Sequence, residues 1–190
     1  MTIKVKAIIG STSSTSFNLK IVEHMKKRYA DQLDITPVFI NDVENFSVDI
    51  ENNPPANVKK FKADVKDSDA VLFAVPEYNF SIPGTMKNAI DWLSRGGDFK
   101  IKDKPAFIIG SSMGVLGSVR AQIHLREILS NPALAPVLLP GNEVYIGSVH
   151  EKVNEIGELT DNGTVEFLDS VVKNFIEFYN KMNATVGVQQ

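Results

Sequence analysis

Three polar turns carry the residue types in this sequence that are best suited to holding a ligand. They span Gly10–Ser16, Pro76–Gly84 and Gly110–Gly117, and each follows a short apolar run. In the first turn, one glycine precedes six Ser or Thr residues. Backbone N–H groups and hydroxyls at the start of a helix form a phosphate-sized site that the helix dipole favours. Because the turn has neither a P-loop lysine nor a second glycine, it favours a monophosphate over a nucleoside triphosphate or a dinucleotide.

The second turn is predicted to be a stiff platform for a flat ligand. Its two prolines fix φ and withhold backbone donors, and Gly84 is expected to permit a conformation that other residues resist. Polar groups surround an aromatic face, which suits orienting contacts to a ring. These residues are Glu77, Tyr78, Asn79 and Ser81. Structural alternatives stay open, because Glu77 could instead cap a following segment or pair with Lys87, and Tyr78 could be a packing aromatic.

The composition is that of an ordinary globular chain and excludes several kinds of chemistry. Of 190 residues, 43% are apolar and 23% charged, which suits one domain over residues 1–190. The net charge of -3 argues against nucleic acid as a partner. There is no cysteine, and the three histidines lie far apart without other ligand residues, so neither a thiolate nucleophile nor a metal site is expected. No signal peptide or membrane-length apolar run occurs, and we expect a cytoplasmic protein without membrane contact.

Apolar runs and amphipathic stretches alternate along the chain, and these elements must position the three turns. The predicted strands are Ile3–Ile9, Ile35–Ile40, Ala70–Val75, Ala106–Ile109, and a fifth strand over Ala135–Leu139 and Val144–Ile146 that is interrupted or bent at Pro140-Gly141. Helical periodicity starts near Ser16 or Phe17 and returns over 57–67, 85–94, 119–129 and from Asp161 onward. Residues 41–57 have no sustained period and are expected to be irregular.

Continuous apolar strands that alternate with helices are typical of a parallel sheet covered on both faces. We therefore predict an α/β fold of the flavodoxin-like kind, a three-layer sandwich with a five-stranded parallel sheet in the order 2-1-3-4-5. In that order the strands before the three turns are neighbours. Their carboxyl ends meet at one edge of the sheet, so the turns are expected to converge there.

The three turns and the helix after the second form three motifs. They read Gly10-Ser11-x-x-x-x-Ser16-Phe17-Asn18, then Pro76-Glu77-Tyr78-Asn79-x-Ser81-Ile82-Pro83-Gly84-x-x-Lys87-Asn88-Ala89-Ile90-Asp91-Trp92, then Ser112-x-Gly114-x-x-Gly117-x-x-Arg120-Ala121-Gln122. In this order they resemble the NADPH-dependent FMN reductase family, which includes quinone, azo and chromate reductases. The resemblance covers roughly residues 3–130 in its motifs, and the order of elements extends it to the rest.

The resemblance implies an FMN site that can be assigned residue by residue. The phosphate loop corresponds to Ser11, Ser13, Ser16, Phe17 and Asn18. The loop along the isoalloxazine ring corresponds to Pro76, Glu77, Tyr78, Asn79 and Ser81, and the turn beside the ring and ribityl chain to Ser112 and Gly114. Two positions depart from the family pattern. Ser13 stands where many relatives carry an arginine, so FMN is expected to be held less tightly, and Ser118 stands where a second glycine is common.

The resemblance also implies an FMN-dependent NAD(P)H oxidoreductase. NADPH or NADH would pass hydride to flavin N5, and a quinone, azo, metal-oxyanion or free-flavin acceptor would then take its place in a ping-pong cycle. No catalytic side chain is assigned, because the cofactor carries the chemistry; backbone N–H groups near Glu77–Asn79 and Ser112–Gly114 are predicted to tune the ring. A homodimer or homotetramer is implied, and the other partner is a small-molecule electron acceptor.

Two other function classes stay open at this point. A flavodoxin-type electron carrier has the same fold but does not oxidise a nicotinamide; the modest net charge disfavours it, since carriers that dock on basic partners usually display a strongly acidic surface. A non-redox binding module without flavin rests only on the missing arginine at position 13. No motif specifies the physiological acceptor or the choice between NADPH and NADH.

Overall fold

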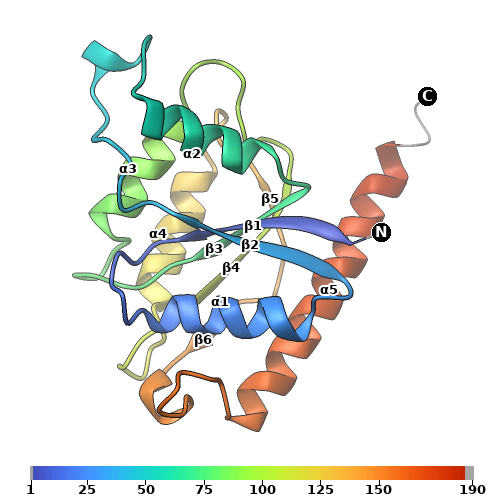
Figure 1. The fold of residues 1–190 in the computed structure, drawn as a ribbon. Helices are drawn as coiled ribbons and strands as arrows, with labels where there is room; N and C mark the ends of the chain where they lie inside the picture. The colour runs from blue at the N-terminus through green and yellow to red at the C-terminus, as the bar shows by residue number, and fades with distance from the viewer. Residues whose placement is uncertain (1, 187–190) are drawn as a thin grey trace.

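A parallel sheet lies between two layers of helices in the computed structural model, which describes residues 2–186 (Figure 1). The strands lie in the order β2-β1-β3-β4-β5, and β6 also pairs with β4. Their bounds are β1 Ile3–Ile9, β2 Leu33–Phe39, β3 Ala70–Ala74, β4 Pro105–Ser111, β5 Val137–Leu138 and β6 Val144–Ile146. The predicted flavodoxin-like α/β fold and its strand order are confirmed.

The central strands explain the apolar runs of the sequence. β3 and β4 are buried along their whole length, so both faces of each strand must be apolar. The fifth strand is divided, as the Pro140-Gly141 dipeptide predicts. β5 pairs with β4 at Pro105 and Ala106, whereas β6 pairs with it at Ile109–Ser111. Both pieces therefore run parallel to β4 along the same edge.

Two groups of helices cover the two faces of the sheet. The helices are α1 Phe17–Arg28, α2 Ala56–Lys66, α3 Gly84–Leu93, α4 Val119–Leu129 and α5 Asn162–Val186, with short 3-10 turns η1 Val48–Ile50 and η2 Val149–Glu151. The apolar sides of α1 and α5 pack on one face, where the rings of Phe107 and Phe175 lie 4.4 Å apart. α2, α3 and α4 pack on the other, around Phe73 and Ile108. Burying each of these large side chains contributes roughly 1.5–3 kcal/mol.

The segment between β2 and α2 is irregular apart from η1, as predicted, and α3 anchors it. The side-chain amide of Asn88 donates to the carbonyl oxygens of Val43 and Glu44 at 3.2 and 3.0 Å. Its oxygen accepts from the N–H of Phe46 at 2.7 Å. Trp92, which is fully buried, donates its indole N–H to the Glu44 carbonyl at 2.7 Å and meets the Phe46 ring edge-on at 5.0 Å. The Asn88–Trp92 end of the second motif therefore has a structural role.

None of the helices within residues 2–186 combines the length and the apolar character that crossing a membrane requires.

Candidate functional site

The first turn is folded by its own hydroxyls. Ser11 Oγ accepts from the N–H of Ser13, and Ser13 Oγ accepts from the N–H of Thr15. Ser16 is the N-cap of α1, and its Oγ accepts from the N–H of Leu19 at 3.2 Å. A hydroxyl that accepts a hydrogen bond still has its proton to donate. The turn therefore presents O–H donors to an anion while the same oxygens hold its shape.

The start of α1 adds backbone donors to these hydroxyls. Within the part of the chain that the structure describes, the N–H groups of Phe17 and Asn18 have no intramolecular acceptor. The last turn of the helix carries Lys26, Lys27 and Arg28, which complement the negative end of the helix dipole. The ring of Phe17 packs against the core, so only its backbone faces outward as a donor. The turn and the helix start form an anion site suited to a phosphate monoester.

The side chain of Asn18 is used inside the protein and is not free to bind a phosphate. Its amide donates to the carbonyl oxygen of Ser111 at 3.2 Å, and its oxygen accepts from the N–H of Ser111 at 2.9 Å. Both residues are buried. This reciprocal pair joins the start of α1 to the end of β4 and so holds the first turn against the third. Ser111 Oγ is buried beside it without a partner in the described residues, an unused polar atom at the edge where a ligand is expected.

The second turn is a tight hairpin over Tyr78–Ser81. The N–H of each of these two residues donates to the carbonyl oxygen of the other, at 3.0 and 3.1 Å. Asn79 and Phe80 between them have φ of +50° and +65°, the left-handed region that type I′ turns require. The expectation that Gly84 supplies the special conformation is wrong. Gly84 is the first residue of α3, has no positive φ, and nothing lies within 4 Å of a Cβ added there.

Glu77 reaches across to the helix that follows the third turn. Its Oε2 accepts from the backbone N–H groups of Arg120 and Ala121 at 3.0 and 3.3 Å. The N-cap residue of α4 makes no side-chain cap bond, so Glu77 takes over the capping of this helix. The alternative pairing with Lys87 is wrong, because Lys87 pairs with Asp91 one helical turn further along α3.

Two more contacts join the second turn to α4. The guanidinium of Arg120 lies over the ring of Phe80 at 3.9 Å, a cation–π contact. The hydroxyl of Ser81 and Nδ1 of His124 are 3.1 Å apart. Half of the surface of Tyr78 is exposed, so its ring is not part of the core of this chain. The hairpin is therefore fixed at its base and presents its aromatic side outward.

The third turn is shaped by close backbone contacts with the loop after β6. A Cβ on Gly147 would lie 2.0 Å from the carbonyl oxygen of Val115, and one on Gly117 would lie 2.6 Å from the Tyr145 backbone. The N–H of Ser112 donates to the Ile146 carbonyl at 3.0 Å, and its hydroxyl donates to the carbonyl of Gly114 at 2.9 Å. The turn is held by main-chain atoms.

The departure at Ser118 has a local cost. Ser118 is buried with φ of +68°, directly after Gly117 with φ of +56°. A residue with a Cβ is strained in this region, whereas glycine is not. Its hydroxyl accepts from the side-chain amide of Gln122 at 3.4 Å, a contact that glycine lacks.

The predicted ring-tuning donors divide into two groups. The N–H groups of Tyr78 and Ser112 are already used inside the protein, by Ser81 and Ile146. Those of Glu77, Asn79, Met113 and Gly114 donate to no acceptor within residues 2–186. These four N–H groups are therefore available to a ligand. Together with the first turn, these donors fit the phosphate and the polar ring edge of FMN.

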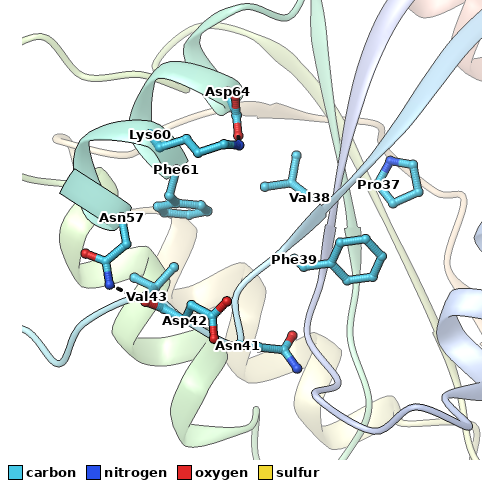
Figure 2. A pocket seen from close by; sticks show the side chains of 10 residues that line it. All are labelled: Pro37, Val38, Phe39, Asn41, Asp42, Val43, Asn57, Lys60, Phe61 and Asp64. Atoms are coloured by element: carbon cyan, nitrogen blue, oxygen red, sulfur yellow. Dashed lines mark hydrogen bonds and ion pairs between the residues drawn. The ribbon is translucent and has the colours of Figure 1, made fainter.

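A separate hollow of about 300 Å³ lies beside β2, the edge strand nearest the first turn (Figure 2). α2 forms one wall and the end of β2 with the following segment forms the other. Lys60 and Asp64 on α2 pair at 2.6 Å, and Phe61 lies at the base. Asn41 on the rim donates to the carbonyl of Thr12 at 3.2 Å, so the hollow adjoins the back of the first turn. None of the predicted site residues lines it.

No group of three or more acidic or histidine side chains in the described residues is arranged to hold a metal ion. What sequence reasoning missed are residues that act through their partners: Ser111, Gly147 and the cap bonds of Glu77. Ser111 directly precedes the third motif, whereas Gly147 lies 25 positions beyond the end of that motif at Gln122, and a capping role between distant segments leaves no spacing signal. The glycine that directly follows the predicted strand Val144–Ile146 is the one signal that could have indicated Gly147.

A phosphate-type turn at the start of α1, with two donor-bearing turns beside it, is the arrangement with which doubly wound proteins bind nucleotide cofactors at a switch point of the sheet. The chain belongs to the NADPH-dependent FMN reductase family, whose sequence profile matches residues 3–151. As a member of this family it is an oxidoreductase that works with FMN and a reduced nicotinamide dinucleotide.

Relatives and a solved structure agree with this assignment. The chain is 37% identical over 179 residues to an NADH-dependent flavin reductase subunit 2 of Lactobacillus johnsonii, covering 92% of this chain and 96% of the relative. It is 34% identical over 184 residues to a quinone reductase of Escherichia coli K12, covering 95% and 97%. The flavoenzyme FerB of Paracoccus denitrificans, an NAD(P)H:(acceptor) oxidoreductase, has a TM-score of 0.85 at 34% identity and covers 95% of this chain and 98% of its own. The electron-carrier alternative is therefore not favoured.

Proposed function

We propose that this chain reduces small quinone-type, azo, metal-oxyanion or free-flavin acceptors with electrons from NADPH or NADH, in a ping-pong cycle. The observation that carries the proposal is the convergence of three turns whose unused donors, among the described residues, are backbone N–H and Ser O–H groups. Such a site orients a cofactor and leaves the substrate face open. Relatives named for flavin and quinone reduction support these two acceptor classes.

The residues of the chain have separate tasks in this proposal. FMN, when bound, supplies hydride acceptance and donation at its ring. Ser11, Ser13 and Ser16, with the N–H groups of Phe17 and Asn18, would hold its phosphate. The N–H groups of the second and third turns would meet the polar edge of the ring, while Pro76 and Tyr78 would lie along it. Since the turns that carry these groups are held by internal hydrogen bonds, little ordering is needed on binding.

We also propose that the chain works as a homodimer or a dimer of dimers. Six large apolar side chains are exposed on the second turn, the third turn and α4: Tyr78, Phe80, Met113, Val115, Leu116 and Ile123. They adjoin the proposed ring site, and a second copy would cover them. In sedimentation experiments, Val115→Asp should lower the oligomeric state. Ile156→Asp, at a similarly exposed position beside α1, should not, and an effect of both or of neither would contradict the assignment.

Anaerobic reduction of the FMN-loaded protein tests the function. Purified protein is mixed with FMN, and its visible spectrum is recorded before and after addition of NADPH and, separately, NADH. We expect bleaching with at least one of them and recovery of the spectrum on adding a benzoquinone. Failure to bind FMN would contradict the site, whereas bound FMN that neither nicotinamide bleaches would support an electron carrier instead. Initial rates at several concentrations of both substrates should give the parallel lines of a ping-pong mechanism.

A further inference from the structure

A second pocket lies at the opposite end of the sheet from the three turns. It has a volume of about 420 Å³ and runs between α2 and the segment that joins α3 to β4. Gly96 and Lys100 belong to this joining segment, and Lys100 precedes the first residue of β4. The three turns follow the last residues of the strands. β4 has seven residues, so roughly 20 Å separates the two places.

The lining of this pocket is strongly basic. Lys59, Lys62 and Lys66 reach it from α2 and Lys100 from the joining segment, whereas Asp98 is the single acid among the residues that line it. The whole chain has a net charge of -3, so this concentration of positive charge does not follow from the composition. Like charges at one site repel one another unless an anion lies between them.

The internal partners of these lysines are too few to balance them. Asp98 pairs with Lys100 and also lies 3.7 Å from Lys66. Lys62 donates at 2.7 Å to an uncharged group, the backbone carbonyl of Arg95. Among the described residues, Lys59 has one hydrogen-bond partner, the side-chain oxygen of Asn53 at 3.2 Å. One carboxylate is therefore shared between two ammonium groups, and the hydrogen-bond partners of the other two are neutral, although the charge of Glu51 also acts on Lys62.

Lys100 differs from the other lysines of the pocket because its side chain is buried. Its side chain is only 8% exposed, although lysine rarely lies inside a protein. Burial, and then the charges of Lys62 and Lys66, lower its pKa below the usual value. The pKa of Lys62 is also lowered, chiefly by burial. Holding these ammonium groups together costs free energy in the protein alone, and an anion in the pocket would reverse that cost.

We propose that this pocket is a binding site for a small phosphate-bearing anion, separate from the redox site. Several ammonium donors around one cavity suit a group with two or more negative charges, because each donor adds a charge-assisted hydrogen bond. The volume exceeds that of an inorganic phosphate, and Pro54 and Ala63 add an apolar part to the wall, so a phosphorylated small molecule fits. Its distance from the three turns makes the ligand an effector, not a reactant.

Titration calorimetry of the FMN-saturated protein with inorganic pyrophosphate tests this proposal, since saturating FMN occupies the other phosphate site. We expect one saturable event whose affinity falls as salt is added. The variant Lys62→Ala/Lys66→Ala should weaken it tenfold or more, because two charge-assisted bonds are lost. The variant Lys26→Ala/Lys173→Ala makes the same charge change on exposed residues of α1 and α5 and should leave the affinity within twofold.

Two further measurements keep the outcome decisive. Lys100→Met retains the length of the buried side chain without its charge and should also weaken pyrophosphate binding several-fold. Malonate, a dicarboxylate, should bind at least tenfold more weakly than pyrophosphate, and equal affinity would overturn the phosphate class. No saturable event, or equal losses in the pocket and control variants, would overturn the site. Because reduction of bound FMN by nicotinamide is measured separately, these results do not depend on the proposed reductase activity.

Discussion

The carboxylate of Glu77 accepts hydrogen bonds from the backbone N–H groups of both Arg120 and Ala121, so a residue of the second turn caps the helix that follows the third. A family position expected to meet the ring edge thus holds two of the site's three turns in register. Its negative charge also complements the positive end of the α4 dipole. The effect of Glu77 on FMN would be indirect.

Removing this cap should weaken both the fold and the site. We expect Glu77→Ala to lower the free energy of unfolding by about 1 kcal/mol, within the range measured for lost N-caps. Glu77→Gln retains an oxygen acceptor and should lose less. Urea unfolding of both variants measures this, and flavin fluorescence titration should show a raised Kd in the same order. A larger effect of Gln than of Ala on FMN binding would favour direct contact with the ring.

The hydrogen bonds between Asn18 and Ser111 should contribute more to the free energy of unfolding than those of an exposed asparagine side chain do. Asn18→Ala leaves the N–H and carbonyl of Ser111 buried without partners, at a cost of roughly 1–3 kcal/mol. FMN should also be retained less well, because the first turn loses its link to the third. Ser16→Ala serves for comparison, since it removes an N-cap bond and a proposed phosphate donor but leaves the Asn18–Ser111 pair intact. Unchanged FMN dissociation constants in both variants would count against the phosphate assignment.

Two glycines that look alike in sequence should respond in opposite ways to alanine. A Cβ on Gly110 would lie 1.9 Å from Ser118 Oγ and 2.6 Å from the carbonyl oxygen of Val75, so Gly110→Ala must distort the end of β4. Gly84→Ala meets nothing and lies in a helix, where alanine is favoured. We expect a fall in thermal midpoint of several degrees for the first. For the second, calorimetry should show no fall.

His24 should make the protein less stable in mild acid. Its Nε2 is buried without a partner in the described residues, and burial, followed by the charge of Arg28, lowers its pKa below 6.5. The unfolded chain therefore binds the proton more readily, and the free energy of unfolding falls as pH drops from about 6.5 toward the lowered pKa. Charged groups that face His24 with the opposite effect are Asp169 and Glu158. The variant His24→Leu should show a shallower fall between pH 7 and 5 in urea titrations; an identical slope would contradict this.

The sequence was sufficient for the features that repeat or that local chemistry dictates. Apolar runs without alternation identified the central strands, Ser16 identified the start of α1, and Pro140-Gly141 identified the division of the fifth strand. Each of these follows from rules that act over a few residues. The three turns could be expected to converge because strand order fixes which carboxyl ends are neighbours.

The rest depended on contacts between distant segments. Asn79 and Phe80, not Gly84, take positive φ, because the paired backbone of Tyr78 and Ser81 forces the turn on them. The partner of Glu77 lies more than forty positions away, and no spacing announces it. The basic pocket combines lysines of one helix with Lys100, and only the packed chain shows that the latter is buried.

The side chains of Asn88 and Trp92 hold the segment after β2 by hydrogen bonds to its main chain, at Val43, Glu44 and Phe46. An anchor of this kind recognises the path of the backbone and not the identity of the residues. Apart from Phe46, whose ring meets Trp92 edge-on, the side chains of the segment can therefore change in evolution while its attachment to α3 stays the same. Among related reductases, this is where we expect sequences to diverge first, and where new surface specificity can arise without disturbing the cofactor site.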